Sequence, residues 1–440
     1  MSPAPAVDSL TAASTRPALR ARSLSAFILL AIVVIGGALR IHYFNPYLIR
    51  TPDERTYTRQ ANIVLVQGIA GFRFLGQEFA QNPPLVSRFP SPARVGYITL
   101  LAAFMRFTGD ASILTGAHLS IVCSVATLLF IAFTAYRFLS STVAIVATLF
   151  YAVFPFDLTV FRRTWQESFI AMLTIAILAA AVLIARTHSV RQLAGLLAFA
   201  FLGVLAITAK ENSAIAFLLC AAGLTLHFIR KRDRRAAILT ASFAAAAVLA
   251  CVLILAALFG GFVNSFILLR EYAHYSGINP YSAQFDTGPV WMFPAGLFRA
   301  SPFLFLAALV GFIVVLYRGC RTQVLSNAGL PLGIALITAF MLLIQILTHR
   351  YNFRYTAPVF GPICLLAGIG IDAILPSLHK LLAPLGRAIT WCILGFSISI
   401  AALRDFNFAR DNFLLPELQD LALRPVLSVP PAPVPPDYPR

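Results

Sequence analysis

The chain has 440 residues, of which 59% are hydrophobic and 12% are charged, and its formal net charge is +17. Soluble domains carry about 25% charged residues, so this composition indicates an integral membrane protein with many spans. The positive charge does not indicate a nucleic-acid partner. The sequence has no long Lys/Arg tract, zinc-finger spacing or RNA-binding signature, and membrane topology with anionic lipid explains the charge.

The N-terminal segment predicts a signal anchor rather than a cleavable signal peptide. Residues 1–22 are rich in Ala, Pro, Ser and Thr and carry Arg16, Arg20 and Arg22. The apolar run 24–43 that follows is too long for a typical signal core, and no small-residue cleavage site follows it. We therefore expect a cytoplasmic N-terminal tail over residues 1–22.

Apolar runs of about 17–25 residues predict the fold class, an all-α polytopic membrane protein with about eleven transmembrane helices. The segment 95–107 is apolar but short, and Arg94 and Arg106 bracket it, so we expect an interfacial or re-entrant helix there. The predicted spans are 23–43, 112–136, 141–160, 167–185, 191–209, 213–229, 236–260, 297–317, 326–348, 357–375 and 386–403.

The positive-inside rule supports this assignment. With the N-terminus in the cytoplasm, every short inner turn is basic, and only Asp233 opposes this charge. The outer loops 44–111 and 261–296 then lie on the extracytoplasmic side. We expect three parts: the tail 1–22, a transmembrane domain over 23–403, and a Pro-rich extracytoplasmic tail over 404–440.

The outer loops also carry arginine, which the positive-inside rule disfavours there. The guanidinium group is a planar fork of donors that suits phosphate and stays charged when desolvated. Several outer acids lie beside a base in sequence, such as Lys210-Glu211 and Arg163 near Glu167, and ion pairs at helix ends would also explain these. Aromatic residues cluster in the same loops, either as a membrane-interface belt or as platforms for sugar rings.

The dipeptide Asp53-Glu54 lies just past the first span, in a charged stretch between apolar segments. A carboxylate pair is costly to desolvate, so we expect it in a wet cavity or in a reaction centre. A carboxylate against a substrate hydroxyl acts as a general base, and cationic neighbours keep it ionised. Arg and Lys across the cavity would stabilise a leaving phosphate.

No cofactor is predicted. The sequence has no HExxH motif, no CxxC pair and no Gly-rich nucleotide loop between a strand and a helix. The six cysteines are expected to be thiols without a disulfide framework. A divalent cation held by Asp53 and Glu54 stays open as an alternative, although it is not predicted.

Several segments, in chain order, resemble GT-C glycosyltransferases, and the nearest group is the protein O-mannosyltransferase and lipid A aminoarabinose transferase superfamily. The acidic pair followed by Tyr57 and Ala61 resembles the first luminal loop of that group. The chain departs from the pattern at Gln166-Glu167, where many relatives show an Asp, and in its tail, which predicts no folded luminal domain. The other resembling segments are Pro90-Ser91-Pro92, Gly96-Tyr97-Ile98-Thr99-Leu100-Leu101, Arg106-Phe107-Thr108-Gly109, Phe154-Pro155 with Arg162, Arg163 and Glu167, Thr208-Ala209-Lys210-Glu211, and 349–358.

The resemblance implies a membrane-embedded glycosyltransferase. The lack of any retrieval signal favours a bacterial inner membrane, with the endoplasmic reticulum as the alternative. The enzyme would move a sugar, with inversion, from a polyprenyl-phosphate donor to a lipid, glycan or protein acceptor on the extracytoplasmic face. Asp53 would be the general base, and Glu54 would support the acceptor or hold the loop. Lys210, Arg350 and Arg354 would bind the donor phosphate. The other expected substrate-binding residues are Tyr57, Arg162, Arg163, Glu167, Glu211, His349 and Tyr355.

Two other classes of function explain part of the sequence. A transporter or flippase for an anionic lipid or solute would also place arginine in a membrane cavity, but it predicts charged residues near the middle of spans. The centres of the predicted spans are nearly free of charge. A non-catalytic scaffold would need no acidic pair among basic residues. The sequence therefore favours the glycosyltransferase.

Overall fold

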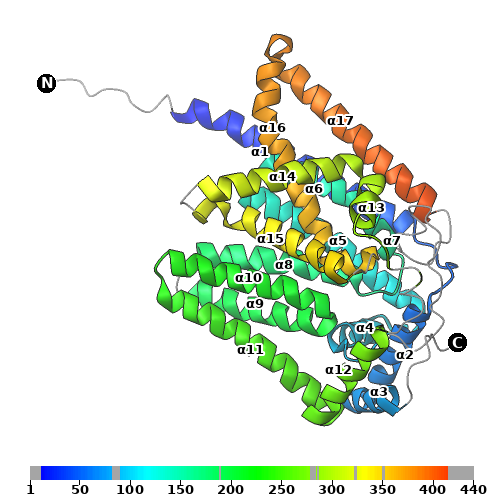
Figure 1. Cartoon of the computed structure of the whole chain (residues 1–440). Helices are drawn as coiled ribbons and strands as arrows, with labels where there is room; N and C mark the ends of the chain where they lie inside the picture. Colours follow the sequence, from blue (N-terminus) through cyan, green and yellow to red (C-terminus); the bar gives the residue numbers. More distant parts are fainter. Residues whose placement is uncertain are drawn as a thin grey trace.

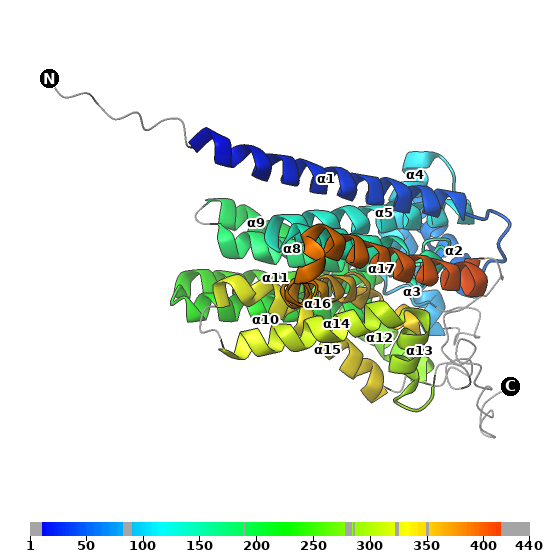
Figure 2. The same cartoon turned by 90° about the horizontal axis from the view of Figure 1, so that it is seen from above.

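The computed structural model describes residues 11–81, 90–187, 190–277, 284, 287–321, 325–348 and 352–414, and every element in these ranges is helical. Most of the long helices run roughly along one direction, whereas α16 crosses them steeply and α17 runs obliquely (Figure 1). The short helices α2, α3, α12 and α13 gather at one end of the bundle (Figures 1 and 2). The elements are α1 (Thr11–His42), α2 (Pro52–Gln67), α3 (Ile69–Gln81), α4 (Val95–Thr108), α5 (Ile113–Phe138), α6 (Ser141–Ala152), α7 (Asp157–Val160), α8 (Glu167–Arg186), α9 (Val190–Ala209), α10 (Glu211–Arg230), α11 (Arg234–Phe259), α12 (Phe262–Gly277), α13 (Met292–Ala300), α14 (Pro302–Arg321), α15 (Leu325–Thr348), η3 (Phe353–Val359), α16 (Phe360–Leu381), η4 (Ala383–Leu385), α17 (Gly386–Ala409) and η5 (Arg410–Leu414).

Eight helices in the described ranges are long and apolar enough to cross a membrane, and a bent pair of helices would make nine. Their many apolar side chains and low charge identify an integral membrane protein. The 14-residue helix α4 is too short to span, as expected for the segment 95–107. The eight spans are Ser23–His42, Ile113–Phe138, Glu167–Arg186, Val190–Ala209, Glu211–Arg230, Arg234–Phe259, Phe353–Leu381 and Ala388–Leu414.

The predicted count of eleven spans is not confirmed, and two of the apolar runs are shorter or broken. The run 141–160 ends as a helix at Ala152, ahead of Phe154-Pro155. The run 297–317 is split between α13 and α14, whose axes differ by 117° across Ser301 and Pro302. Proline disfavours helical backbone in the residue before it, which accounts for both breaks. Helix α15 is continuous over the 24 residues Leu325–Thr348 and matches the predicted run 326–348.

Helix boundaries also differ from the predicted tails. Helix α1 begins at Thr11, inside the segment expected as the N-terminal tail. Helix α17 continues to Ala409, and a π-helical turn extends to Leu414, so the last span passes the expected boundary at residue 403. The sequence runs Leu403-Arg404-Asp405 at that point, and the Arg404–Asp405 ion pair lets the helix carry these charges. The Pro-rich stretch from 415 onward lies outside the described residues.

Helix α16 is the most enclosed span. In its best apolar window, 83% of the residues are buried, compared with 28% for α1. Helix α14 packs closely against it through two glycines, because a Cβ atom on Gly311 would overlap the Leu366 carbonyl and one on Gly370 would overlap the Ala307 carbonyl. Small residues let helix backbones approach closely in membranes, where packing rather than the hydrophobic effect holds helices together.

A buried ion pair fixes the irregular segment that follows α6. The Arg40 guanidinium on α1 contacts the Asp157 carboxylate at 2.5 Å, and both side chains are fully buried. Ser124 on α5 and Tyr151 on α6 donate hydrogen bonds to the same carboxylate. The paired and hydrogen-bonded charges tie together four helices, α1, α5, α6 and α7. They hold the turn from Phe154 to Gln166 in place at the end of the bundle where the candidate site lies.

Candidate active site

Asp53 and Glu54 lie in the first turn of helix α2 rather than in a loop. Thr51 is the N-cap residue, its Oγ1 accepts from the Glu54 N–H, and the Glu54 carboxylate accepts from the Thr51 N–H. This reciprocal capping box, with Pro52 at the first helical position, starts the helix at this point. It points the two neighbouring carboxylates in different directions.

Asp53 faces the candidate site. Its side chain is 31% exposed, and its Oδ2 lies 2.9 Å from Nη2 of Arg354. Arg354 belongs to η3, where the Asn352 side chain accepts from the Arg354 N–H and caps the helix. The Arg354 guanidinium also lies over the Trp165 ring at 3.9 Å, which fixes the plane of its donors.

A second carboxylate extends this chain of charges into the protein. Glu167 is fully buried at the start of α8, and its Oε1 lies 3.3 Å from Nε of Arg354 and 3.0 Å from Nζ of Lys210. Lys210 is the N-cap residue of α10 and lies under the Tyr355 ring at 5.2 Å. Asp53, Arg354, Glu167 and Lys210 therefore form one network, which we call the charge relay cluster.

Glu54 points away from this cluster and is fully buried. Its Oε1 accepts from Arg50 at 3.1 Å and from the Thr164 N–H at 2.9 Å. Its Oε2 accepts from the Thr51 N–H at 2.8 Å and from Arg163 at 3.1 Å. Both oxygens are therefore occupied, and these contacts join the first turn of α2 to the α7–α8 connection.

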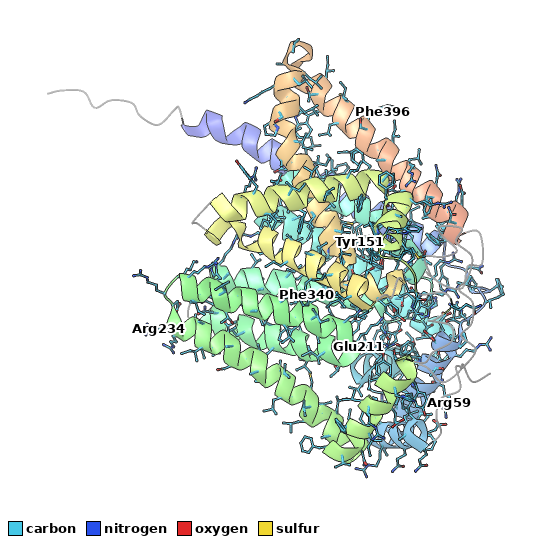
Figure 3. All side chains as sticks on the ribbon, viewed as in Figure 1. Arg59, Tyr151, Glu211, Arg234, Phe340 and Phe396 are labelled. Atoms are coloured by element: carbon cyan, nitrogen blue, oxygen red, sulfur yellow. The ribbon has the colours of Figure 1, made fainter. Side chains whose placement is uncertain are left out.

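Arg94 connects a further group of polar side chains to the cluster. Its Nη1 donates to the Tyr57 hydroxyl at 2.6 Å, and its Nη2 lies 3.2 Å from the Glu211 carboxylate. Tyr272 on α12 donates to the same Glu211 oxygen at 2.8 Å, and Tyr57 also hydrogen bonds to Gln166. Burial raises the pKa of Tyr57 well above its ordinary value, so its hydroxyl keeps its proton. Glu211 is labelled at the end of α10 in Figure 3.

The structure thus brings together Asp53, Arg354, Glu167, Lys210 and Tyr355, with Tyr57 and Glu211 beside them. Two expected substrate-binding residues have other partners. Arg162 donates to the Phe413 and Leu414 carbonyls and holds the end of the last helix, and Arg163 pairs with Glu54. His349 and Arg350 lie outside the described residues.

Ion pairs between sequence neighbours are the wrong interpretation for two of the expected pairs. Lys210 pairs with Glu167 rather than with Glu211, and Arg163 pairs with Glu54 rather than with Glu167, in the part of the chain that the structure describes. Lys210 is the extended N-cap residue of α10 and Arg163 lies in the turn before α8, so neither shares a helix face with the acid near it in sequence.

Sequence reasoning did not assign site roles to Arg94, Trp165, Gln166 and Tyr272. Arg94 stands out in the sequence as a cation directly before a short apolar helix, and Gln166 as a departure from the family pattern. Trp165 and Tyr272 were indistinguishable from other aromatic residues of the outer loops, because nothing local marks which rings lie beside a cation.

Several polar atoms beside the cluster are buried without a hydrogen-bond partner in the described residues. They include Oε2 of Glu167, Nε2 of Gln166, the Tyr97 hydroxyl and Oγ of Ser213. Buried polar atoms are nearly always paired in native proteins. A polar ligand with several hydroxyl groups would supply the missing partners.

A divalent cation shared by Asp53 and Glu54 does not fit this geometry. Both Glu54 oxygens are occupied by donors, and Asp53 faces a guanidinium group. Elsewhere in the described ranges, no three His, Cys, Asp or Glu side chains converge in a group that could hold a metal ion.

Comparison with known proteins places these features in a wider context. The model of the Alg9-like mannosyltransferase family matches residues 27–422. None of the curated protein sequences matches the chain. The structure is similar to the oligosaccharyltransferase of Archaeoglobus fulgidus in the apo form, with a TM-score of 0.63 and 13% identity, covering 88% of this chain and 55% of that one. The chain thus spans about half the length of that enzyme.

A second similar fold is that of ArnT from Cupriavidus metallidurans. The apo structure has a TM-score of 0.55 and 14% identity, with 90% of this chain and 78% of that chain covered. The structure of ArnT bound to undecaprenyl phosphate has a TM-score of 0.54 and 13% identity, with 90% and 77% covered.

Proposed function

Because the chain belongs to the Alg9-like mannosyltransferase family and is a membrane glycosyltransferase of the GT-C class, we propose that its donor is a polyprenyl-phosphate sugar and that Asp53 is its general base. The all-α polytopic fold expected from the sequence agrees with the similar folds of the oligosaccharyltransferase and ArnT. ArnT binds undecaprenyl phosphate, which supports a lipid-phosphate ligand for a related fold. The family match also displaces the transporter and scaffold interpretations.

The observation that carries the proposal is that Arg354 contacts two carboxylates, those of Asp53 and Glu167. This side chain contacts Asp53 at 2.9 Å and Glu167 at 3.3 Å, while Lys210 contacts Glu167 at 3.0 Å. A partly exposed carboxylate thus adjoins Arg354, and a second cation, Lys210, is joined to Arg354 through Glu167. General base and anion cradle lie at the same end of the bundle.

The proposed reaction uses these groups as follows. Asp53 accepts the proton of an acceptor hydroxyl, and the acceptor oxygen forms a bond to the anomeric carbon of the sugar. The bond between that carbon and the phosphate oxygen breaks, and the polyprenyl phosphate leaves with the bonding electron pair. Arg354 and Lys210 stabilise the negative charge that develops on the phosphate. Attack opposite the leaving group inverts the anomeric centre.

Arg354 also couples donor binding to the base. In the structure, its guanidinium occupies Oδ2 of Asp53 at 2.9 Å. A donor phosphate competes with Asp53 for the same guanidinium donors. Donor binding therefore releases Asp53 toward the acceptor, so that the base becomes available only when the sugar is in place.

The remaining site residues have supporting parts in this proposal. Glu54 and Arg163 hold Asp53 in position, and Tyr57, Glu211 and Tyr355 surround the cations. The acceptor is a lipid, glycan or protein hydroxyl or amine on the extracytoplasmic face, in a bacterial inner membrane with the N-terminus in the cytoplasm. The reaction as written requires no resident cofactor.

The test is glycosyl transfer by the purified full-length protein in detergent, with a panel of radiolabelled polyprenyl-phosphate sugars. Asp53→Asn should reduce transfer at least about 100-fold, the lower end of the contribution of general base catalysis. The variant should keep its melting temperature, because Asp53 is partly exposed and Arg354 keeps its ion pair with Glu167.

Glu271→Gln is the matched control, because Glu271 is a carboxylate that contacts Arg270 near the end of α12 and lies outside the charge relay cluster. Turnover retained by Asp53→Asn would rule out the base assignment. If no donor in the panel were bound or turned over, the polyprenyl-phosphate assignment would be wrong.

A further inference from the structure

Helix α2 borders a second feature on the face that points away from the charge relay cluster. The buried face of α2 includes Glu54, Tyr57 and Gln60. Its opposite face lines an open groove of about 940 Å³ between α2, the α1–α2 connection and the start of α5. The residues on which the argument depends are Arg50, Arg55, Arg59, Ile63, Val66 and Ile113.

Three arginines give this groove a positive charge. Arg55 is exposed, and no described residue forms an ion pair with it. Arg59 is half exposed and pairs with Glu78 on α3, and it is labelled at this end of the bundle in Figure 3. Arg50 is mostly buried and pairs with Glu54. Glu78 accepts from both Nη1 and Nη2 of Arg59, at 2.9 and 2.7 Å, so Arg55 is the guanidinium that is open to an anion. Guanidinium groups bind phosphate through two parallel hydrogen bonds.

The same groove has an apolar wall. Ile63 and Val66 lie one helical turn apart on α2, and Ile113 faces them from the start of α5. Val66 is 83% exposed, so the described residues leave most of its apolar surface uncovered. Cations beside exposed aliphatic side chains at the end of a transmembrane bundle match an amphiphile with an anionic head and hydrocarbon chains.

We propose that this groove binds an anionic lipid, with its phosphate headgroup on Arg55, beside the charge of Arg59, and a hydrocarbon chain along Ile63 and Val66. A free phosphate would use the arginines but leave the apolar wall exposed, so the groove fits a lipid better than a soluble anion. The bound lipid would also touch Arg50, whose Nη1 bonds to Glu54 beside the base. The proposal does not depend on the identity of the glycosyl donor.

The experiment measures lipid binding by the purified full-length protein in neutral detergent micelles. Phosphatidylglycerol is titrated and binding is followed by native mass spectrometry and by the melting temperature. Phosphatidylglycerol should bind and raise the melting temperature, while zwitterionic phosphatidylcholine should bind at least about tenfold more weakly. Arg55→Gln with Arg59→Gln should weaken phosphatidylglycerol binding about tenfold or more, since the first change removes charged hydrogen bonds to the phosphate and the second removes a positive charge beside it.

Arg106→Gln is the matched control, because Arg106 is an exposed arginine on α4 that does not line the groove. It should bind phosphatidylglycerol like the unaltered protein. Arg55→Gln alone removes no described contact and so tests the site in a folded protein.

Unchanged binding in the double variant would overturn the proposal, and so would equal binding of the two lipids. If glycerol phosphate bound as tightly as phosphatidylglycerol, the groove would be a site for a soluble anion and the lipid assignment would be wrong. All of these readouts are independent of turnover, so they stand or fall separately from the proposed glycosyl transfer.

Discussion

Asp53 at the start of α2 and Arg354 in η3 form an ion pair of 2.9 Å between two segments that lie far apart in the sequence. Local contacts orient both side chains. A capping box orients Asp53, and the Asn352 cap together with the Trp165 ring orients Arg354. The pair is therefore the point at which the proposed base and the proposed phosphate site meet.

Replacing Arg354 should weaken donor binding more than acceptor binding. Arg354→Ala removes a charged phosphate contact, which costs about 1.5–3 kcal/mol, or roughly a 10- to 100-fold loss in donor affinity. Arg354→Lys should give an intermediate loss, because it keeps the charge but loses the planar fork and its contact with the Trp165 ring. Donor and acceptor dissociation constants, measured separately on the purified protein, check this. Unchanged donor affinity in Arg354→Ala would exclude the phosphate role.

Lys210 should set an alkaline limit on donor binding. Burial lowers the pKa of Lys210 below its ordinary value of 10.5, although Glu167 partly opposes the shift. As the pH rises through this lowered pKa, the ammonium group loses its proton and its attraction for phosphate. Donor affinity should therefore fall at a pH below 10.5 rather than above it.

The matched variant for this limit is Lys210→Arg, because the guanidinium group stays charged in proteins at this pH. Donor affinity of that variant should show no decline over the same pH interval. A pH profile of donor binding in both proteins provides the measurement. The same alkaline decline in Lys210→Arg would assign it to another group.

The sequence predicted the membrane class, eight of the spans and the importance of the acidic pair, because each of these depends on local composition. Long apolar runs such as 167–185 must cross the bilayer, and Asp53-Glu54 is conspicuous where acids are scarce. The short helix over 95–107 was also predictable, since its length is set by the flanking Arg94 and the turn after Thr108.

The pairing of charges could not be predicted, because it depends on how distant helices pack. The Glu167 carboxylate pairs with Lys210 at the start of α10 and with Arg354 in η3. The sequence around Glu167 does not indicate either partner. Likewise, the different directions of Asp53 and Glu54 follow from the capping box, which places one side chain inside and the other toward the site. Residue types indicated that charged groups would gather at the site, whereas helix packing determines which of them form ion pairs.

Glu54 should contribute more to stability than an exposed carboxylate in an equivalent pair. Glu54→Gln leaves Arg50 and Arg163 buried without their counter-charge, and breaking a buried pair in this way costs about 3–5 kcal/mol. Glu78→Gln, which breaks the exposed pair with Arg59, should cost about 1 kcal/mol or less. Melting temperatures of the two variants in the same detergent compare the effects. Equal losses would show that Glu54 does not hold the α2 turn.

The close contact between α14 and α16 should be intolerant of a single methyl group. Gly370→Ala would push a Cβ atom into the Ala307 carbonyl oxygen, and because both contacting groups are helix backbone, the strain cannot be relieved by a side-chain rotation. Overpacking of this kind costs about 1–3 kcal/mol. The control is Gly223→Ala on α10, where no atom lies within 4 Å of the new Cβ, so the substitution should stabilise the helix by about 0.5–1 kcal/mol. Opposite shifts of the melting temperature are therefore expected from the same chemical change, and a Gly370→Ala protein as stable as Gly223→Ala would mean that α14 and α16 do not pack at backbone contact.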